Sequence, residues 1–185
     1  TYTLKETVAP TGYTSATETT FIIDEMGNAT TTGTKTDDGV ILVEDTMTEV
    51  KVLKVDVTDG KELPGAFIQI IEKETGKVVE EWISTEEIHV IRGLEVNTTY
   101  ILHEETAPEG YIVATDTEFI MDENGNITTT GTINPEGVLI IEDAVTHVIV
   151  EKVDDTDHKL IGGAHLEVRD SKGNVVAKWI SEDGK

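Results

Sequence analysis

The sequence contains no cysteine, and that absence excludes several kinds of chemistry. Disulfides, cysteine nucleophiles, thiolate zinc clusters and dithiol redox pairs all need a thiol. A covalent staple within a small domain of this chain must therefore come from other side chains. No apolar run approaches the roughly 18 residues of a transmembrane helix. No signal peptide is recognisable at Thr1 either, but an internal fragment would lack both features whatever its destination.

Basic residues are scarce as well. The chain has 14 lysines and arginines against 37 acidic residues, which gives a formal charge of −23. This charge repels nucleic acids and anionic membrane surfaces, so neither is expected as a partner. The five histidines show no metal-ligand spacing. We therefore expect no metal and no cofactor.

Aromatic residues amount to only 5%, whereas apolar residues reach 37% and are dominated by Val and Ile. Branched side chains of this kind favour strands. No window of the sequence shows a sustained helical period. The composition and the pattern together predict a globular, all-β protein.

The most informative feature that is present is a long repeat. The segment TYTLKETVAPTGY, at Thr1–Tyr13, recurs as TYILHEETAPEGY at Thr99–Tyr111, 98 residues later. Further pairs recur at the same spacing: Gly39–Thr46 with Gly137–Ala144, and Val50–Asp59 with Val148–Asp157. A period of this length makes each repeat a domain of its own.

The register of the repeat predicts the domain boundaries. Residues 50–147 hold one complete unit. Residues 1–49 hold the C-terminal part of a preceding unit, and residues 148–185 hold the N-terminal part of a following one. We therefore expect tandem domains, with both ends of the chain lying inside a repeat.

Short strands with turn signals between them fill the complete unit. The expected strands are Val50–Lys54, Gly65–Glu72, Lys77–Ile83, Tyr100–Glu104, Glu118–Met121, Ile127–Thr130 and Val138–Ile141. The last is apolar on both faces, which is typical of a central, buried strand. Seven or so such strands predict a β-sandwich.

Three charged residues fall on or beside the apolar faces of these strands. Lys54 alternates with valines, Glu104 alternates with Tyr100 and Leu102, and Asp143 follows the last strand. Burial in an apolar interior favours the neutral form of both an amine and a carboxyl group. A neutral lysine is a nucleophile, and a neighbouring glutamic acid can polarise a carboxyl group and shuttle protons as water leaves. The product would be an intramolecular isopeptide bond.

Two alternatives remain open at this stage. Glu142 is adjacent to Asp143, and because Ile140 makes both phases of the strand apolar, either carboxylate could face inward. Glu44 and Asp45 pose the same choice in the first partial unit. The three charges could also form an unreacted buried salt-bridge cluster.

Several residues in the complete unit match a known signature. Tyr100, Leu102, Glu104, Ala107, Pro108, Gly110 and Tyr111 match YxLxExxAPxGY, while Lys54–Asp56 and Gly65–Ala66 match KVD and GA elements. In these motifs the chain resembles the CnaB-type, or SpaA-like prealbumin-like, domains of Gram-positive surface proteins and pilins. The resemblance extends over all 185 residues.

The resemblance implies tandem immunoglobulin-like β-sandwich domains whose first and last strands are joined by an isopeptide bond. It assigns Lys54 and Asp143 to the crosslink and Glu104 to proton transfer. In the partial units it assigns Glu6 as the equivalent glutamate, Asp45 as an acceptor and Lys152 as a lysine. Many family members have asparagine as the acceptor, whereas this chain offers aspartate.

Three functions compete on this basis. The first is a stalk module of a Gram-positive cell-surface protein, stabilised by a self-catalysed Lys-Asp bond and packed against neighbouring repeats. The second is a self-assembling fibre, in which Lys152 of one chain reacts with Asp45 of the next. The third is an adhesin that binds a host protein directly. Turnover of an external substrate is not expected. The expected location is the bacterial surface, with wall anchoring through a segment outside this chain.

Other motifs have simpler interpretations. Asp122, Glu123 and Asn124 resemble part of a calcium loop, but the bidentate glutamate is missing and a hairpin turn is expected. Glu104 and Glu105 cannot act together as a glycosidase pair, because adjacent strand residues face opposite ways. Trp82 and Trp179 recur at matching positions and are expected to be core residues.

Overall fold

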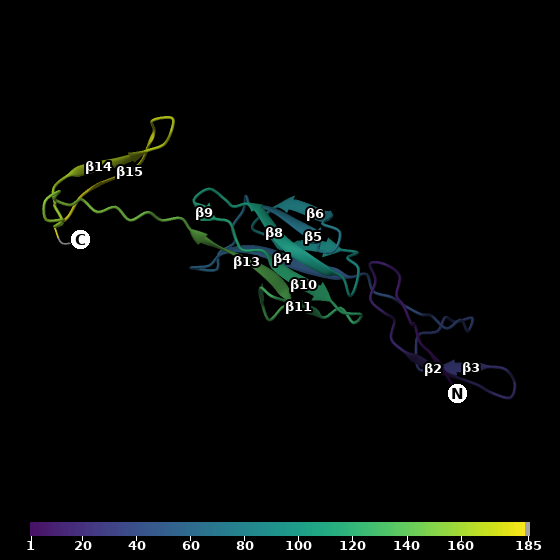
Figure 1. Ribbon diagram of the computed structural model, residues 1–185. Helices are drawn as coiled ribbons and strands as arrows, with labels where there is room; N and C mark the ends of the chain where they lie inside the picture. Colours follow the sequence, from purple (N-terminus) through teal and green to yellow (C-terminus); the bar gives the residue numbers. More distant parts are fainter. Residues whose placement is uncertain (184–185) are drawn as a thin grey trace. The chain divides into compact units, whose positions relative to one another are not determined.

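The computed structural model describes residues 1–183, and every regular element in that range is a β-strand (Figure 1). Within that range there is therefore no helix that could cross a membrane. The chain divides into two compact units, Thr1–Thr146 and His147–Lys185. The all-β expectation is confirmed.

A pair of sheets makes up the centre of the first unit. One sheet has the order β11-β10-β8-β5-β6, and the other has the order β12-β13-β4-β7, with β9 added to β13. The strands of the first sheet are β5 Phe67–Glu72, β6 Val78–Ile83, β8 Thr99–Thr106, β10 Thr117–Met121 and β11 Ile127–Thr129. Those of the second are β4 Glu49–Asp56, β7 His89–Arg92, β9 Tyr111–Ile112, β12 Thr132–Ile133 and β13 Val138–Val145. All seven expected strands are present, with ends shifted by a few residues.

Strands β4 and β13 run parallel, although they begin and end this part of the chain. Val138 pairs with Lys51, and Asp143 pairs with Asp56. The ladder continues past β4, where the Val57 amide donates to the Asp143 carbonyl at 3.0 Å. All other strand pairs of the chain, over the described residues, are antiparallel. The first and last strands therefore lie next to each other in the middle of one sheet.

The core lies between the two sheets and follows the alternation of the strands. Along β4, Val50, Val52 and Lys54 are buried, and along β8 the buried residues are Tyr100, Leu102 and Glu104. Other fully enclosed side chains are Ile68, Ile70, Phe119 and Leu139. Hydrophobic burial of this kind is the main stabilising contribution to such a domain.

Residues 1–48 form a smaller sheet with the order β1-β2-β3, in which β1 is Tyr2–Leu4, β2 is Thr19–Ile23 and β3 is Ala29–Thr31. It has the same pairing as β8, β10 and β11, which lie 98 residues later in the sequence. Tyr2 stacks on Phe21 with ring centroids 5.2 Å apart, as Tyr100 stacks on Phe119 at 5.6 Å. Ile22 and Ile23 are about half exposed. This sheet therefore buries much less apolar surface than its counterpart.

The second unit contains one hairpin, β14 His165–Arg169 and β15 Val175–Ile180. Its turn is closed by Asp170, whose carboxylate accepts bonds from the amides of Lys172 and Asn174. The Ala164 amide donates to the Ser181 hydroxyl at 3.0 Å, as Ala66 donates to Ser84 at 2.9 Å. The second unit thus repeats a local hydrogen bond of the central sandwich.

Candidate functional site

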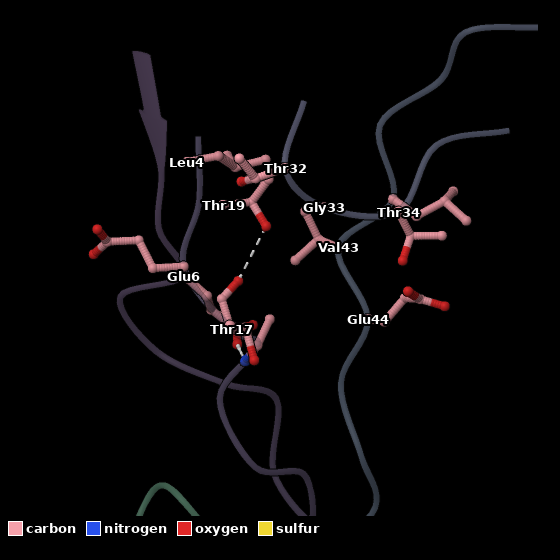
Figure 2. A pocket seen from close by; sticks show the side chains of 12 residues that line it. Leu4, Glu6, Thr17, Thr19, Thr32, Gly33, Thr34, Val43 and Glu44 are labelled. Atoms are coloured by element: carbon pink, nitrogen blue, oxygen red, sulfur yellow. Dashed lines mark hydrogen bonds between the residues drawn. The ribbon is translucent and has the colours of Figure 1, made fainter. Parts of the chain in front are cut away.

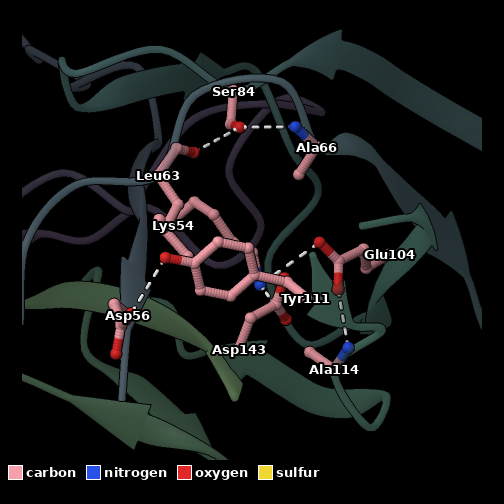
Figure 3. Close-up of polar contacts among 9 residues, drawn as sticks. All are labelled: Lys54, Asp56, Leu63, Ala66, Ser84, Glu104, Tyr111, Ala114 and Asp143. Carbon is pink, nitrogen blue, oxygen red and sulfur yellow. Dashed lines mark hydrogen bonds and ion pairs between the residues drawn. The ribbon is translucent and has the colours of Figure 1, made fainter. Parts of the chain in front are cut away.

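The site is a cluster of three charged side chains between the two sheets of the central sandwich (Figure 3). Lys54, Glu104 and Asp143 are each 0% exposed at the side chain. The Lys54 ammonium nitrogen lies 3.2 Å from Glu104 Oε1 and makes a still closer contact with Asp143 Oδ1. The three residues that the sequence singled out are therefore in mutual contact.

Each side chain reaches the site because of its phase in a strand. Lys54 continues the inward face of β4, and Glu104 continues the inward face of β8. Asp143 lies on β13, whose Ile141 is the pairing partner of Lys54. The lysine and the aspartate therefore come from adjacent parallel strands of one sheet, and the glutamate faces them from the other.

The structure resolves which acidic residue of β13 faces inward. Asp143 is 0% exposed, whereas Glu142 is exposed and accepts a hydrogen bond from the Thr132 hydroxyl at 2.9 Å. Sequence alternation could not decide this because both phases of the strand were apolar. Pairing with β4 decides it, because Ile141 pairs with the inward-facing Lys54 and Asp143 lies two residues further along the same face.

The cluster receives one hydrogen bond from the backbone, and several of its polar atoms have no hydrogen-bond partner. Glu104 Oε2 accepts a bond from the Ala114 amide at 2.6 Å, which fixes the orientation of this carboxyl group. Among the described residues, Lys54 Nζ, Glu104 Oε1 and both Asp143 oxygens have no hydrogen-bond partner of good geometry, and their contacts are ionic. Buried charges held only by one another are costly relative to the same groups in water.

Burial and the neighbouring Glu104 act on Asp143 in the same direction. Removal from water raises the pKa of its carboxyl group, Lys54 opposes that rise, and Glu104 adds to it, so that the pKa is about 6. A carboxyl group in this range accepts and releases protons easily near neutral pH. The arrangement brings an amine and a protonatable carboxyl group into contact in a dry environment.

Two hydrogen-bonded groups that the sequence reasoning did not identify lie around the cluster (Figure 3). The Tyr111 hydroxyl donates to Asp56 Oδ2 at 3.0 Å and ties the end of β4 to β9. The Ser84 hydroxyl donates to the Leu63 carbonyl at 2.7 Å and accepts from the Ala66 amide. Asp56 and Tyr111 belong to the KVD and APxGY elements, so their presence in those motifs was an available signal.

Residues 48–135 match the family described as the SpaA prealbumin-like fold domain. This part of the chain belongs to that family. The match includes Lys54 and Glu104 and ends before Asp143.

Several solved structures resemble the chain at low identity. A pilus-presented adhesin is 27% identical over 48% of this chain and 20% of its own, with a TM-score of 0.40. The Bacillus anthracis TIE protein is 25% identical over 97% of this chain and 32% of its own, with a TM-score of 0.45. A shaft pilin, SpaA of Lactobacillus rhamnosus GG, is 18% identical over 80% of this chain and 65% of its own, with a TM-score of 0.44. The chain thus spans no more than a third of the first two proteins, and no curated protein matches it.

The segment before the SpaA-type domain carries an incomplete version of the cluster. Glu6 Oε2 accepts a bond from the Ala16 amide at 2.7 Å, which repeats the bond between Glu104 and Ala114. Burial and the nearby Glu6 carboxylate raise the pKa of Asp45. Asp45 Oδ1 is enclosed and has no hydrogen-bond partner, and Glu44 is exposed. Two carboxylates therefore meet here without a lysine.

A cavity beside Glu6 has a counterpart beside Glu104. Figure 2 shows the first, whose lining includes Glu6, Thr19 and Gly33. The second has Glu104 and Thr117 at matching positions in its lining. Lys152 belongs to the other unit, where its ammonium group donates to the Val153 carbonyl at 3.1 Å.

The remaining candidate motifs have structural uses. Asp122 accepts bonds from the amides of Asn124 and Asn126, so this segment is a hairpin turn as expected. Glu104 is buried and Glu105 is exposed. Trp82 is half-buried against the core and stacks on His89 with centroids 4.2 Å apart. Within residues 1–183, no group of three His, Asp or Glu side chains has a metal-binding arrangement.

Proposed function

We propose that this chain is a structural segment of a Gram-positive cell-surface protein or pilus, built from successive SpaA-type repeats. Residues 50–147 form the whole repeat, and residues 1–49 and 148–185 are parts of its neighbours. The family match and the 98-residue recurrence support this proposal. The family is structural rather than enzymatic, and the reactive cluster has no access for an external substrate because its side chains are fully enclosed.

We further propose that Lys54 and Asp143 form an isopeptide bond with the help of Glu104. The observation that carries this step is the contact of an amine with a carboxyl group at zero exposure, beside a second carboxyl group. The low polarity of the site favours transfer of the ammonium proton to a carboxylate, which leaves a neutral amine.

The reaction needs no external reagent. The neutral amine of Lys54 attacks Cγ of Asp143, while protonated Glu104 donates to the Asp143 oxygen on which negative charge develops. One carboxyl oxygen then leaves as water, taking a proton from the amine through Glu104. An amine and a carboxylic acid are thereby converted into an amide and one water molecule. Glu104 ends as it began and is held in place by the Ala114 amide.

Such a bond would join two adjacent parallel strands at the beginning and end of the domain. Force applied to the ends of the domain would then pass from β4 to β13 through a covalent link. The rest of the sandwich would carry little of that load. A stalk or pilus shaft exposed to shear has an evident use for this property.

Intact-mass measurement of the denatured chain tests the crosslink. We expect a mass below that of the sequence by one water, about 18 Da, and a tandem mass spectrum that joins Lys54 to Asp143. The Asp143→Asn variant should instead lose ammonia, about 17 Da, because the leaving group changes. The Glu104→Ala variant should keep its full mass. If the wild-type chain had its full mass, the crosslink would be absent and the three side chains would form only an unreacted ion-pair cluster.

Matched control variants separate chemistry from folding. Glu142→Gln changes the adjacent, exposed carboxylate and should crosslink as the wild type does. Lys51→Arg changes a lysine on the same strand that pairs with Glu49 at the surface, and it should also react normally. Loss of the mass change in either control would contradict the assignment to Lys54 and Asp143.

We propose a second candidate function, covalent joining of separate copies, on the basis of the incomplete cluster. Asp45 Oδ1 is enclosed without a hydrogen-bond partner, and Glu6 is in position to transfer protons. Lys152 of a second copy could supply the missing amine and release one water on bonding to Asp45. Denaturing gels of concentrated protein should then show ladders that disappear in the Lys152→Arg and Asp45→Ala variants. Monomer alone in those gels would rule this function out.

A further inference from the structure

A tight joint connects residues 1–48 to the SpaA-type domain, and Thr48 lies at its centre. Thr48 is only 1% exposed. Its amide donates to the Gly12 carbonyl at 2.9 Å, and its own carbonyl accepts from the Gly93 amide at 3.2 Å. Its hydroxyl lies 2.7 Å from the Leu94 carbonyl and 3.2 Å from the Gly12 carbonyl. One side chain therefore bonds to both sides of the joint.

The backbone approach at this joint admits only glycine at position 12. A β-carbon on Gly12 would lie 2.9 Å from the Gly93 carbonyl oxygen and 3.0 Å from Gly93 Cα. Gly12 also has φ of 83°, in the left-handed region that side chains disfavour. Because the atoms that a side chain would meet are backbone, they cannot move aside without shifting the turn. The close fit makes this contact specific.

A second contact lies away from Thr48. The Ser15 amide donates to the Glu123 carbonyl at 3.0 Å. The loop that receives it is shaped by Asn97, which has φ of 58°, donates its amide to Met121 and donates its side chain to Glu123 at 3.3 Å. A single point of contact would permit rotation about the connecting backbone. Two separated contacts resist this rotation.

The first half of the joint recurs at the far end of the same domain. Gly110 and Thr146 lie 98 residues after Gly12 and Thr48. The Thr146 amide donates to the Gly110 carbonyl at 2.7 Å, and its hydroxyl donates to the same oxygen at 2.9 Å. The domain thus carries one half of the joint, Gly93 and Leu94, and also the opposite half, Gly110 and Thr146.

We infer that these two halves form an interaction surface that locks successive repeats in one fixed orientation. The partner of the Gly93–Leu94 turn is the Gly-Thr pair of the preceding repeat. The partner of Gly110 and Thr146 is the corresponding turn of a following SpaA-type repeat. This inference rests on the repeat organisation proposed above, but it does not depend on the isopeptide bond. An array joined in this way is a stiff rod rather than a string of swivelling domains.

Distances between spin labels on the full chain test the joint. The sequence has no cysteine, so Thr30→Cys on β3 and Glu81→Cys on β6 provide two exposed labelling sites. We expect one narrow distance distribution. Thr48→Val keeps the shape of the side chain but removes the bridging hydroxyl, and Gly12→Ala introduces the clash, so both should broaden the distribution. Thr48→Ser should restore it, and Thr146→Val, which removes the equivalent hydroxyl at the other end, should leave it unchanged.

Amide exchange on the same proteins identifies the cause. The amides of Gly93 and Ser15 should exchange about tenfold faster in Thr48→Val, whereas those of Val50 and Val52 should not change. The mass of every variant shows independently whether Lys54 has reacted, so failure of the joint and failure of the crosslink are distinguishable. A broad distribution in the wild type, or a narrow one in both Thr48→Val and Gly12→Ala, would overturn the inference. Failure of Thr48→Ser to restore a distribution broadened by Thr48→Val would overturn the role of the hydroxyl.

Discussion

The cluster in the central domain and the carboxylate pair in the preceding segment share the same arrangement of acidic side chains and differ in one residue. In both, the glutamate carboxylate accepts a bond from the backbone amide ten residues later, Glu104 from Ala114 and Glu6 from Ala16. Both have an enclosed aspartate oxygen and a raised aspartate pKa. Only the central cluster has a lysine.

Two neighbouring carboxylates without a lysine do not form an electrostatically favourable site. At Asp45 the neighbouring charge is Glu6, so both desolvation and repulsion disfavour ionisation and no group opposes them. At Asp143 the contact with Lys54 opposes these effects. The lysine therefore turns a repulsive pair into a cluster of opposite charges in which bond formation is chemically possible.

The largest expected effect comes from removing that lysine. Lys54→Ala leaves Glu104 and Asp143 together without a lysine, as Glu6 and Asp45 are in the first segment, and it prevents any crosslink. We expect the free energy of unfolding of the central domain to fall by at least about 3–5 kcal/mol, the usual result of breaking a buried ion pair. Thermal unfolding measures this as a decrease of roughly 15–30 °C in Tm.

The control for that experiment is another lysine of the same strand. Lys51 pairs with Glu49 at 3.3 Å on the surface, and Lys51→Ala should cost less than about 1 kcal/mol. If Lys54→Ala and Lys51→Ala lowered the free energy of unfolding equally, the buried cluster would contribute no more to stability than a surface ion pair.

An intermediate effect should appear in the pH dependence of the unreacted site. In a Glu104→Gln background, which is expected not to crosslink, burial still raises the pKa of Asp143 above its unfolded value of 3.8. The folded state then binds the proton more tightly, so the contribution of Asp143 to stability is greatest below pH 4. That contribution declines as the pH rises through the folded pKa, which is about 6 in the wild type.

The measurement compares Glu104→Gln with the double variant Glu104→Gln/Asp143→Asn in urea at pH 4 and pH 7. The difference between their free energies of unfolding isolates Asp143 from the other aspartates, several of which have lowered pKa values. We expect the single variant to lose stability relative to the double variant as the pH rises. A change in the opposite direction would mean that the ion pair with Lys54 outweighs burial.

The smallest effect concerns a surface position at which the two regions also differ. His103 contacts Asp116 at 2.7 Å and Glu105 at 3.1 Å, whereas Lys5 occupies its place in the first segment. The hydrogen bond with Asp116 is the main cause of the raised pKa of His103. Its stabilising contribution is complete below the unfolded pKa of about 6.5 and disappears as the pH rises through the higher folded value.

Replacement of Asp116 by Asn should weaken this dependence, and Glu105 should retain the remainder. Because the pair is near the surface, we expect less than about 1 kcal/mol, detectable as a change in the His103 titration followed by NMR. The Glu18→Gln variant, at the matching position of the first segment, should leave the His103 titration unchanged. An unchanged His103 titration in Asp116→Asn would contradict the assignment.

Much of the central domain could be predicted from alternation along the chain. The inward phase of Lys54 and Glu104 follows from the apolar residues on either side of them, and the Asp122 turn follows from its sequence. Alternation failed at Asp143 because Ile140 and Ile141 make β13 apolar on both faces. There the phase depends on pairing with β4, which is a non-local property.

Other features were missing from the sequence reasoning because they arise only when distant segments meet. The bond between Tyr111 and Asp56 joins residues that are 55 positions apart in the sequence. The approach of Gly12 to Gly93 depends on two turns that are far apart in the sequence. Nothing in the local sequence around either glycine identifies the other as its neighbour.

The parallel pairing of β4 with β13 also has a consequence for the order of folding. Hairpins such as β5-β6 and β10-β11 join neighbouring strands and close short loops, whereas Lys51 and Val138 come together only across almost the whole domain. Contacts of such long sequence separation carry the largest entropic cost of closure and tend to form late. Lys54 and Asp143 would thus meet only in a chain that has already folded. A covalent bond between them would therefore be present only in chains that had completed the last step of folding.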